Sequence, residues 1–192
     1  MLDYENNMLI SLYNIVDKKK LIKYLLEYTS FFEKGQPKNI NLYSFYNRIG
    51  NYYWVNKEDY SKALEYFHKA ALALLPHESN PDFYADLNYR SCISVLNLIT
   101  ALNNKGEAFY QLSKIRNTKK ESLRDLKECY KNLGLSLDYM YSYKMQQTTE
   151  EQKYFYSNFT SHKYPNFIKV AWNCITKPVR NFTGMRPSNM LN

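Results

Sequence analysis

The fold of this chain is decided by the stretch YNRIGNYYW at 46–54, together with YSKALEYFHKA at 60–70 and the proline that follows at Pro76. Both segments carry apolar residues at helical spacing. Gly50 and Ala63 are small, so two helices can approach closely there, and we expect these residues to face each other. Pro76 prevents the second helix from continuing. The stretch therefore predicts an antiparallel helical hairpin, with helices at 41–55 and 58–75.

The spacing within this hairpin resembles the tetratricopeptide repeat (TPR) pattern of aromatic, small and apolar positions. The residues that carry the resemblance, which we expect to define the repeat structurally, are Tyr46, Gly50, Tyr53, Ala63, Phe67, Ala70 and Pro76. A second, weaker match begins at Leu102-x2-Lys105-Gly106-x2-Phe109, although Lys105 replaces an apolar position. In the helix that follows it, the pattern's small, large and small positions fall on Ser122, Leu126 and Cys129. The resemblance implies an α-solenoid that binds other proteins.

The remaining sequence also reads as helix, so we expect an all-α, TPR-like solenoid of about three antiparallel hairpins plus a C-terminal capping helix, over 1–176. Thr118 with Glu121, and Thr148 with Glu151, form capping boxes that open two of the helices. Pro81 suits the first turn of a long helix that reaches Ile115. The expected parts are a degenerate hairpin at 4–35, the TPR at 41–76, a divergent long-helix repeat at 82–146, a capping helix at 149–175 and a basic flexible tail at 177–192.

The order of these segments along the chain indicates which group of TPR proteins the sequence resembles. A repeat ending at Pro76, a long helix closing in ALNNKGEA at 101–108, a basic turn and a later TEE at 149–151 are similar in arrangement to the TPR region of CHAT-domain proteins. In those proteins a TPR array precedes a caspase-like cysteine peptidase domain. The resemblance implies a regulatory or sensor segment. The peptidase itself has no counterpart in this chain, because residues 176–192 are too few to contain it.

Little in the sequence favours catalysis, a metal or a cofactor. The five glycines are too scattered for a phosphate-binding loop. Cys174 and His162 are the only late Cys/His pair, but Cys174 continues an apolar helical pattern and is expected to be buried and inert. The three cysteines are widely spaced, and no secretion signal or membrane span is recognisable. We therefore expect a cytoplasmic, non-enzymatic protein with reduced cysteines.

The candidate binding residues follow from the hairpin geometry. If Gly50 and Gly106 face the second helix of each hairpin, the opposite stripe of the first helices lines a concave groove. That stripe carries amides, a carboxylate and aromatic residues, which suit an extended peptide: Asn47, Asn51, Trp54, Asn103, Glu107 and Tyr110. For Trp54 the alternative is that its ring folds over the 56–59 turn and packs against Tyr60.

The resulting functional hypothesis is a protein–protein interaction module that binds a partner peptide or helix, with a caspase-like CHAT peptidase as a candidate partner. Two alternatives stay open. The chain has a net charge of +8, and the acidic residues end at Glu151, so the basic C-terminal part could bind an anion or nucleic acid. The basic residues are sparse along that part, which disfavours nucleic acid. The other alternative is a truncated remnant of a larger CHAT-type protein, without independent function.

Overall fold

The computed structural model describes residues 18–33 and 38–146. In these ranges the chain is all-helical: five α-helices and one 3-10 turn are present, and no strand. The all-α prediction is therefore confirmed. The first helix of the 4–35 hairpin, the 149–175 capping helix, the 177–192 tail and the pair Cys174 and His162 lie outside the described residues.

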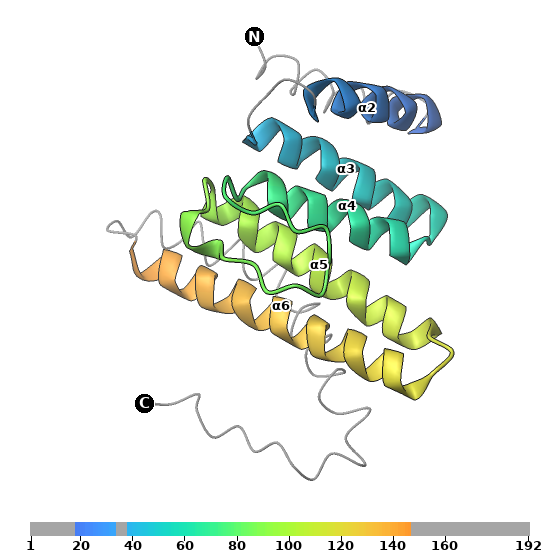
Figure 1. Ribbon diagram of the computed structural model, residues 1–192, viewed down its shortest axis with the longest axis vertical. Helices are drawn as coiled ribbons and strands as arrows, with labels where there is room; N and C mark the ends of the chain where they lie inside the picture. The colour runs from blue at the N-terminus through green and yellow to red at the C-terminus, as the bar shows by residue number, and fades with distance from the viewer. Residues whose placement is uncertain (1–17, 34–37, 147–192) are drawn as a thin grey trace.

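The helices follow one another as a row of neighbours, and Figure 1 shows them side by side in chain order. Each helix packs on the next, and α3 also touches α5, which skips one helix. Their bounds are α2 Lys18–Glu33, α3 Ile40–Lys57, α4 Tyr60–Ala73, α5 Val95–Ile115 and α6 Lys119–Met145. The predicted helices at 18–33, 41–55, 58–75 and 119–146 are thus present within a few residues.

The hydrophobic core forms two adjoining clusters. One lies between α2 and α3 and extends to the C-terminal end of α4 and the N-terminal part of α5. The other lies among α4, α5 and α6 and is built around Phe67, Phe109 and Leu133. Tyr53 packs against both clusters, so the first hairpin and the second share one continuous interior.

The first hairpin is formed by α3 and α4. Asn39 caps α3 by accepting the Leu42 N–H, and Asp59 caps α4 by accepting the Lys62 N–H. Between them Glu58 adopts the left-handed conformation at φ 50°, which reverses the chain in a tight turn. Helix α4 ends at Ala73, just before Pro76.

Gly50 lies at the contact between these two helices, as the sequence predicts, but its partner is not Ala63. A Cβ at Gly50 would stand 2.6 Å from the Phe67 ring, so the absence of a side chain lets this ring pack onto the α3 backbone. Ala63 is fully buried one turn earlier on α4. The other repeat-defining positions Tyr46 and Ala70 are buried, and Tyr53 stacks on Tyr66.

The second hairpin, α5 and α6, repeats this contact. A Cβ at Gly106 would stand 2.7 Å from the Leu133 side chain. Leu133 therefore occupies the role of Phe67, and the buried residues at the same spacing around it are Cys129 and Ser136. The predicted assignment to Ser122, Leu126 and Cys129 is wrong by seven residues. Seven residues are two helical turns, so both registers present the same face and sequence spacing does not separate them.

The prediction of a helix from residue 82 is also wrong, because α5 begins at Val95. Residues 76–94, which we call the strap, are irregular apart from the 3-10 turn η1 Tyr89–Ser91. Short polar side chains hold this backbone in local turns: Asn80, Asp82 and Asn88 each accept the N–H two residues ahead. Such bonds compete with helix formation. Figure 1 shows the strap in front of α5.

Candidate interaction surface

Helices α3 and α5, the first helices of the two hairpins, are joined by polar side chains. Asn104 Nδ2 donates a hydrogen bond of 2.7 Å to Asn47 Oδ1. The Tyr43 and Thr100 side chains meet one turn earlier. Residues in both pairs are separated by 57 positions, so α3 and α5 run parallel and in register. Their half-buried polar stripes therefore form one continuous surface.

This surface contains amide groups that the protein leaves unused. Asn51 is half-buried and makes no hydrogen bond with another described residue. The register places it at the level of Ala108, one residue from Glu107, which is half-buried as well. The Oδ1 atom of Asn103 is buried and has no partner among the described residues. Buried polar groups in folded proteins are nearly always hydrogen-bonded, so the Asn103 Oδ1 atom is an exception, whereas the half-buried Asn51 amide remains accessible to a ligand.

Tyr110 completes the stripe at the C-terminal end of α5. The Lys114 ammonium lies 3.8 Å from the centroid of its ring. The same ammonium donates to Gln111 Oε1 at 2.9 Å. These contacts hold the half-buried phenol ring in one orientation, which lowers the entropy cost of using it as a contact surface.

Trp54 does not belong with this stripe. Its ring meets Tyr60 edge-on at 5.3 Å between centroids and lies 6.4 Å from the Phe67 ring. The side chain thus folds over the turn between α3 and α4 and packs on the core, as in the alternative interpretation. The prediction of Trp54 as the groove anchor is wrong, because its apolar area is used by the hairpin. Of the other predicted groove residues, Asn47 and Asn51 lie on α3 and Asn103, Glu107 and Tyr110 lie on α5, and Asn47 contacts α5 through Asn104.

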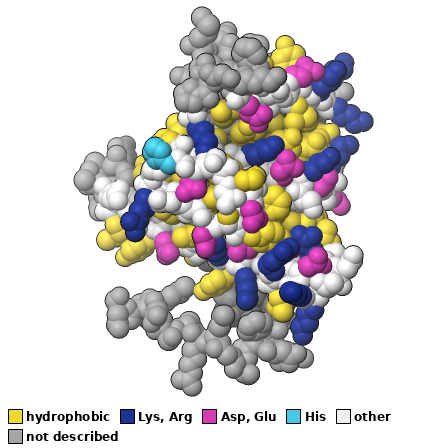
Figure 2. Space-filling view, in the orientation of Figure 1, with side chains coloured by type: hydrophobic (Ala, Val, Ile, Leu, Met, Phe, Trp, Pro, Cys, Tyr) yellow, Lys and Arg dark blue, Asp and Glu magenta, His cyan; other side chains and the backbone are white. Residues whose placement is uncertain are grey.

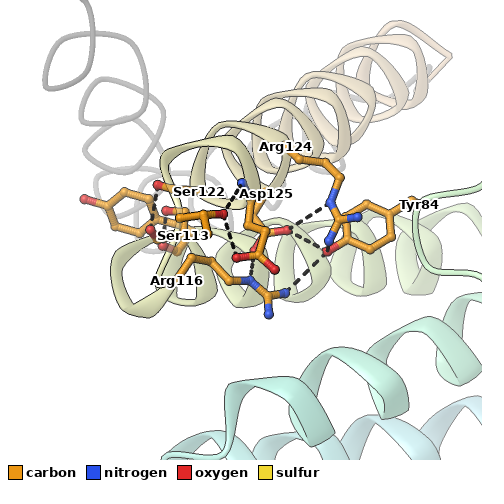
Figure 3. Close-up of polar contacts among 9 residues, drawn as sticks. Tyr84, Ser113, Arg116, Ser122, Arg124 and Asp125 are labelled. Carbon is orange, nitrogen blue, oxygen red and sulfur yellow. Dashed lines mark hydrogen bonds and ion pairs between the residues drawn. The ribbon is translucent and has the colours of Figure 1, made fainter.

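A second polar constellation, which sequence spacing does not reveal, ties the strap to the second hairpin (Figure 3). Asp125, on α6, is completely buried. It accepts the Tyr84 hydroxyl and the Arg116 Nε–H, both at 2.6 Å. Arg124 donates to the Tyr84 hydroxyl at 2.9 Å and covers the Tyr84 ring at 3.9 Å. Burial and the nearby Asp125 carboxylate raise the pKa of Tyr84.

This network engages two of the basic residues around the α5–α6 turn. Because Arg116 and Arg124 are bound to Asp125 and Tyr84, their charges are partly neutralised within the protein. The network therefore acts as a cross-link between strap and helices. The residues lie far apart in the sequence, and only the fold brings them together.

Beneath the strap two further ionisable side chains are almost fully buried. Lys105 on α5 is 1% exposed, and desolvation lowers its pKa from 10.5 to about 8. His68 on α4 is 2% exposed, and desolvation lowers its pKa from 6.5 to about 4, with the positive charge of Lys105 acting in the same direction. His68 is therefore neutral at pH 7, and its Nε2–H donates to the Asn80 carbonyl at 2.8 Å.

Within the described ranges no group of three or more His, Cys, Asp or Glu side chains is placed to hold a metal ion. Nor is any helix of residues 18–33 and 38–146 long and apolar enough to cross a membrane. Cys129 is buried and Cys92 is half-buried, and neither is in a disulfide bond in the part of the chain that the structure describes. Comparison with known proteins adds nothing to these observations: no protein-family model, no curated protein and no solved structure matches this chain.

Proposed function

We propose that this protein is a non-catalytic interaction module, a TPR-like helical solenoid that binds a segment of a partner protein across α3 and α5. The observation that carries the proposal is the two contacts, Asn47 with Asn104 and Tyr43 with Thr100, that set these helices parallel and in register. Stacked hairpins with parallel first helices present a continuous surface, which is how helical-repeat proteins bind their ligands.

The chemistry of the stripe favours an extended peptide as the ligand. The half-buried amide of Asn51 can both donate and accept hydrogen bonds, which matches the alternating N–H and C=O groups of an extended backbone. Tyr110 supplies apolar area beside a hydroxyl and has few rotatable bonds, as is typical of residues that dominate binding energy.

The arrangement of segments suggests the class of partner. Since the sequence resembles the TPR region of CHAT-domain proteins, we take a caspase-like peptidase as the candidate partner. In that case the module would hold or control the peptidase.

A selection from a random peptide library tests the proposal without knowledge of the partner. Peptides are selected on the wild-type chain, and their affinities are then measured for Asn51→Ala and Tyr110→Ala. Each substitution should weaken binding by about tenfold, because each removes a contact worth about 1–2 kcal/mol. Asn56→Ala and Tyr130→Ala are the matched controls, since these side chains are exposed and lie off the stripe. Equal losses in the controls, or none in the stripe variants, would refute the proposal.

A further inference from the structure

The strap is longer than the connection of two helices requires. Helix–helix connections in compact domains usually take about two to eight residues. Residues 76–94 instead cross the molecule and contact three helices: His68 on α4, Phe109 on α5, and Asp125 on α6. In Figure 1 the strap lies over α5, with α4 on one side and α6 on the other. The strap thus fills a groove whose walls are α4 and α6 and whose floor is α5.

The way the strap is held is that of a bound peptide. A main-chain carbonyl, that of Asn80, is recognised by a side chain of the groove. Two adjacent aromatic residues are the anchors: Phe83 meets the His68 ring edge-on at 6.0 Å, and Tyr84 packs on Phe109 at 5.3 Å. At the far end Asp86 forms an ion pair with Lys131 of α6. Backbone recognition, aromatic anchors and a charged end are the components by which grooves select extended peptides.

The fit between strap and groove is incomplete. No hydrogen bond or ion pair joins the buried Lys105 ammonium to another described residue. Its nearest charges of opposite sign, Glu128, Asp82 and Asp86, act on it only from a distance. The Nδ1 atom of His68 is also buried without a partner in the part of the chain that the structure describes. The Lys105 ammonium lies 5.9 Å from the centroid of the Phe109 ring, but no carboxylate of the described residues is bonded to it. A cation buried without a counter-charge is costly, so a ligand that brought a carboxylate to Lys105 would bind better than the strap does.

The position of Asp82 in the strap indicates where a ligand could bring a carboxylate to Lys105. Its carboxylate acts electrostatically on both Lys105 and His68, but its Oδ1 is turned back to accept the Tyr84 N–H of its own chain. A glutamate is one methylene longer and is less suited to this local turn. At position 82 a glutamate could therefore extend to the floor of the groove. Figure 2 shows acidic and basic side chains interspersed with apolar patches on the face that carries the strap.

We propose that the groove between α4 and α6 is a second peptide-binding site, which the strap occupies as an internal ligand. Its external ligand is an extended segment of a partner protein with an acidic residue directly before two aromatic residues, glutamate being preferred. Because the strap is tethered, its effective concentration is high, and a free peptide competes poorly until the strap is released. The site lies on a different face from the α3–α5 stripe and does not depend on the function proposed for that stripe.

The probe is a fluorescein-labelled peptide with the sequence of residues 80–88, NPDFYADLN, and its glutamate form NPEFYADLN. Binding to the full chain is measured by fluorescence anisotropy, for the wild type and for the double variant Phe83→Ala/Tyr84→Ala, whose strap has lost its anchors. We expect the double variant to bind at least about tenfold more tightly than the wild type. Circular dichroism and a melting curve establish that the variant is folded. Should it unfold, Tyr84→Phe replaces it, with a smaller gain expected.

Two controls identify the contacts. A peptide with alanine at both aromatic positions should not bind the double variant. The glutamate form should bind about threefold or more tightly than the aspartate form, and Lys105→Met in the double-variant background should abolish that difference. Equal affinities for wild type and a folded strap variant, or binding that ignores the aromatic residues, would overturn the proposal. Persistence of the glutamate preference without Lys105 would overturn its electrostatic part. Asn51→Ala should leave all these affinities unchanged, which separates this site from the stripe.

Discussion

Replacing the buried Lys105 by methionine should stabilise the protein. A methionine side chain has a similar length and fills the same space without a charge. In the folded chain the pKa of Lys105 is lowered from 10.5 to about 8, because burial removes the ammonium from water. Each unit of pKa corresponds to about 1.36 kcal/mol, so the charged form destabilises the fold by about 3 kcal/mol at pH 7.

The pH dependence of this gain distinguishes it from improved packing. Between pH 8 and 10.5 the unfolded chain binds a proton at Lys105 that the folded chain has released, so the stability of the wild type rises with pH in that window. In Lys105→Met this contribution is absent. The advantage of the variant should therefore be about 3 kcal/mol at pH 7 and should shrink steadily as the pH approaches 10.

Urea unfolding followed by circular dichroism at pH 7, 8, 9 and 10 measures both quantities. The difference between variant and wild type removes the titration of the tyrosines, which both proteins share. Lys127→Met is the matched control, since Lys127 is exposed on α6 and its replacement should change stability by less than about 0.5 kcal/mol at every pH. A Lys105→Met variant that is less stable than the wild type, or whose advantage is the same at all four pH values, would refute the reasoning.

Three further predictions test other parts of the structure by the same unfolding assay. Gly50→Ala should lower the free energy of unfolding by about 1–3 kcal/mol, because its Cβ would overlap the packed Phe67 ring. Gly134→Ala, with open space around its Cβ, should raise it by up to about 1 kcal/mol, and equal effects of the two substitutions would disprove the close contact at Gly50. Tyr84→Phe should cost about 1–2 kcal/mol, because it removes a hydroxyl from the buried Asp125; an unchanged midpoint would show that the bond contributes nothing. Since the pKa of His68 is lowered to about 4, the unfolded chain binds a proton at His68 below pH 6.5 that the folded chain does not, and stability should fall between pH 6.5 and 4. His68→Asn should flatten that decline. An identical slope in the variant would assign the decline to other groups.

The first hairpin could be predicted closely because its signals are local. Small residues at Gly50 and Ala63, the stop at Pro76 and helical periodicity each depend on neighbours in the chain, and the helix bounds followed within a few residues. The partner of Gly50 was missed, since spacing identifies a small contact position but not the side chain that fills it. In the second hairpin the small–large–small pattern recurs after seven residues, so Leu126 and Leu133 are equivalent by spacing. Only the length of α5 and the α5–α6 turn decides between them.

The strap could not be predicted, because tertiary contacts determine it. The sequence around Pro81 has the features of a helix start, but turns at Asn80 and Asp82 replaced the helix. Once the strap crosses α5, residues distant in the sequence meet, and Tyr84 reaches Asp125 forty-one positions later. The strap also helps to bury Lys105. In the sequence, Lys105 stood out because it replaces an apolar position of the repeat pattern. Trp54 was misassigned because its position, one helical step from Tyr53, allows its ring to face either the groove or the turn between α3 and α4. In the structure the ring packs on Tyr60 at the turn.

The central claim is that ligand segments lie across the paired helices α3 and α5, and photo-cross-linking tests it most directly. A library-selected peptide carrying benzoylphenylalanine at successive positions is irradiated with the wild-type chain, and the cross-linked residues are identified by mass spectrometry. We expect cross-links on both helices of the stripe, within 44–51 of α3 and 103–111 of α5, and their loss in Asn51→Ala. Cross-links confined to the strap, to α4 and α6, or to one helix alone would contradict the claim.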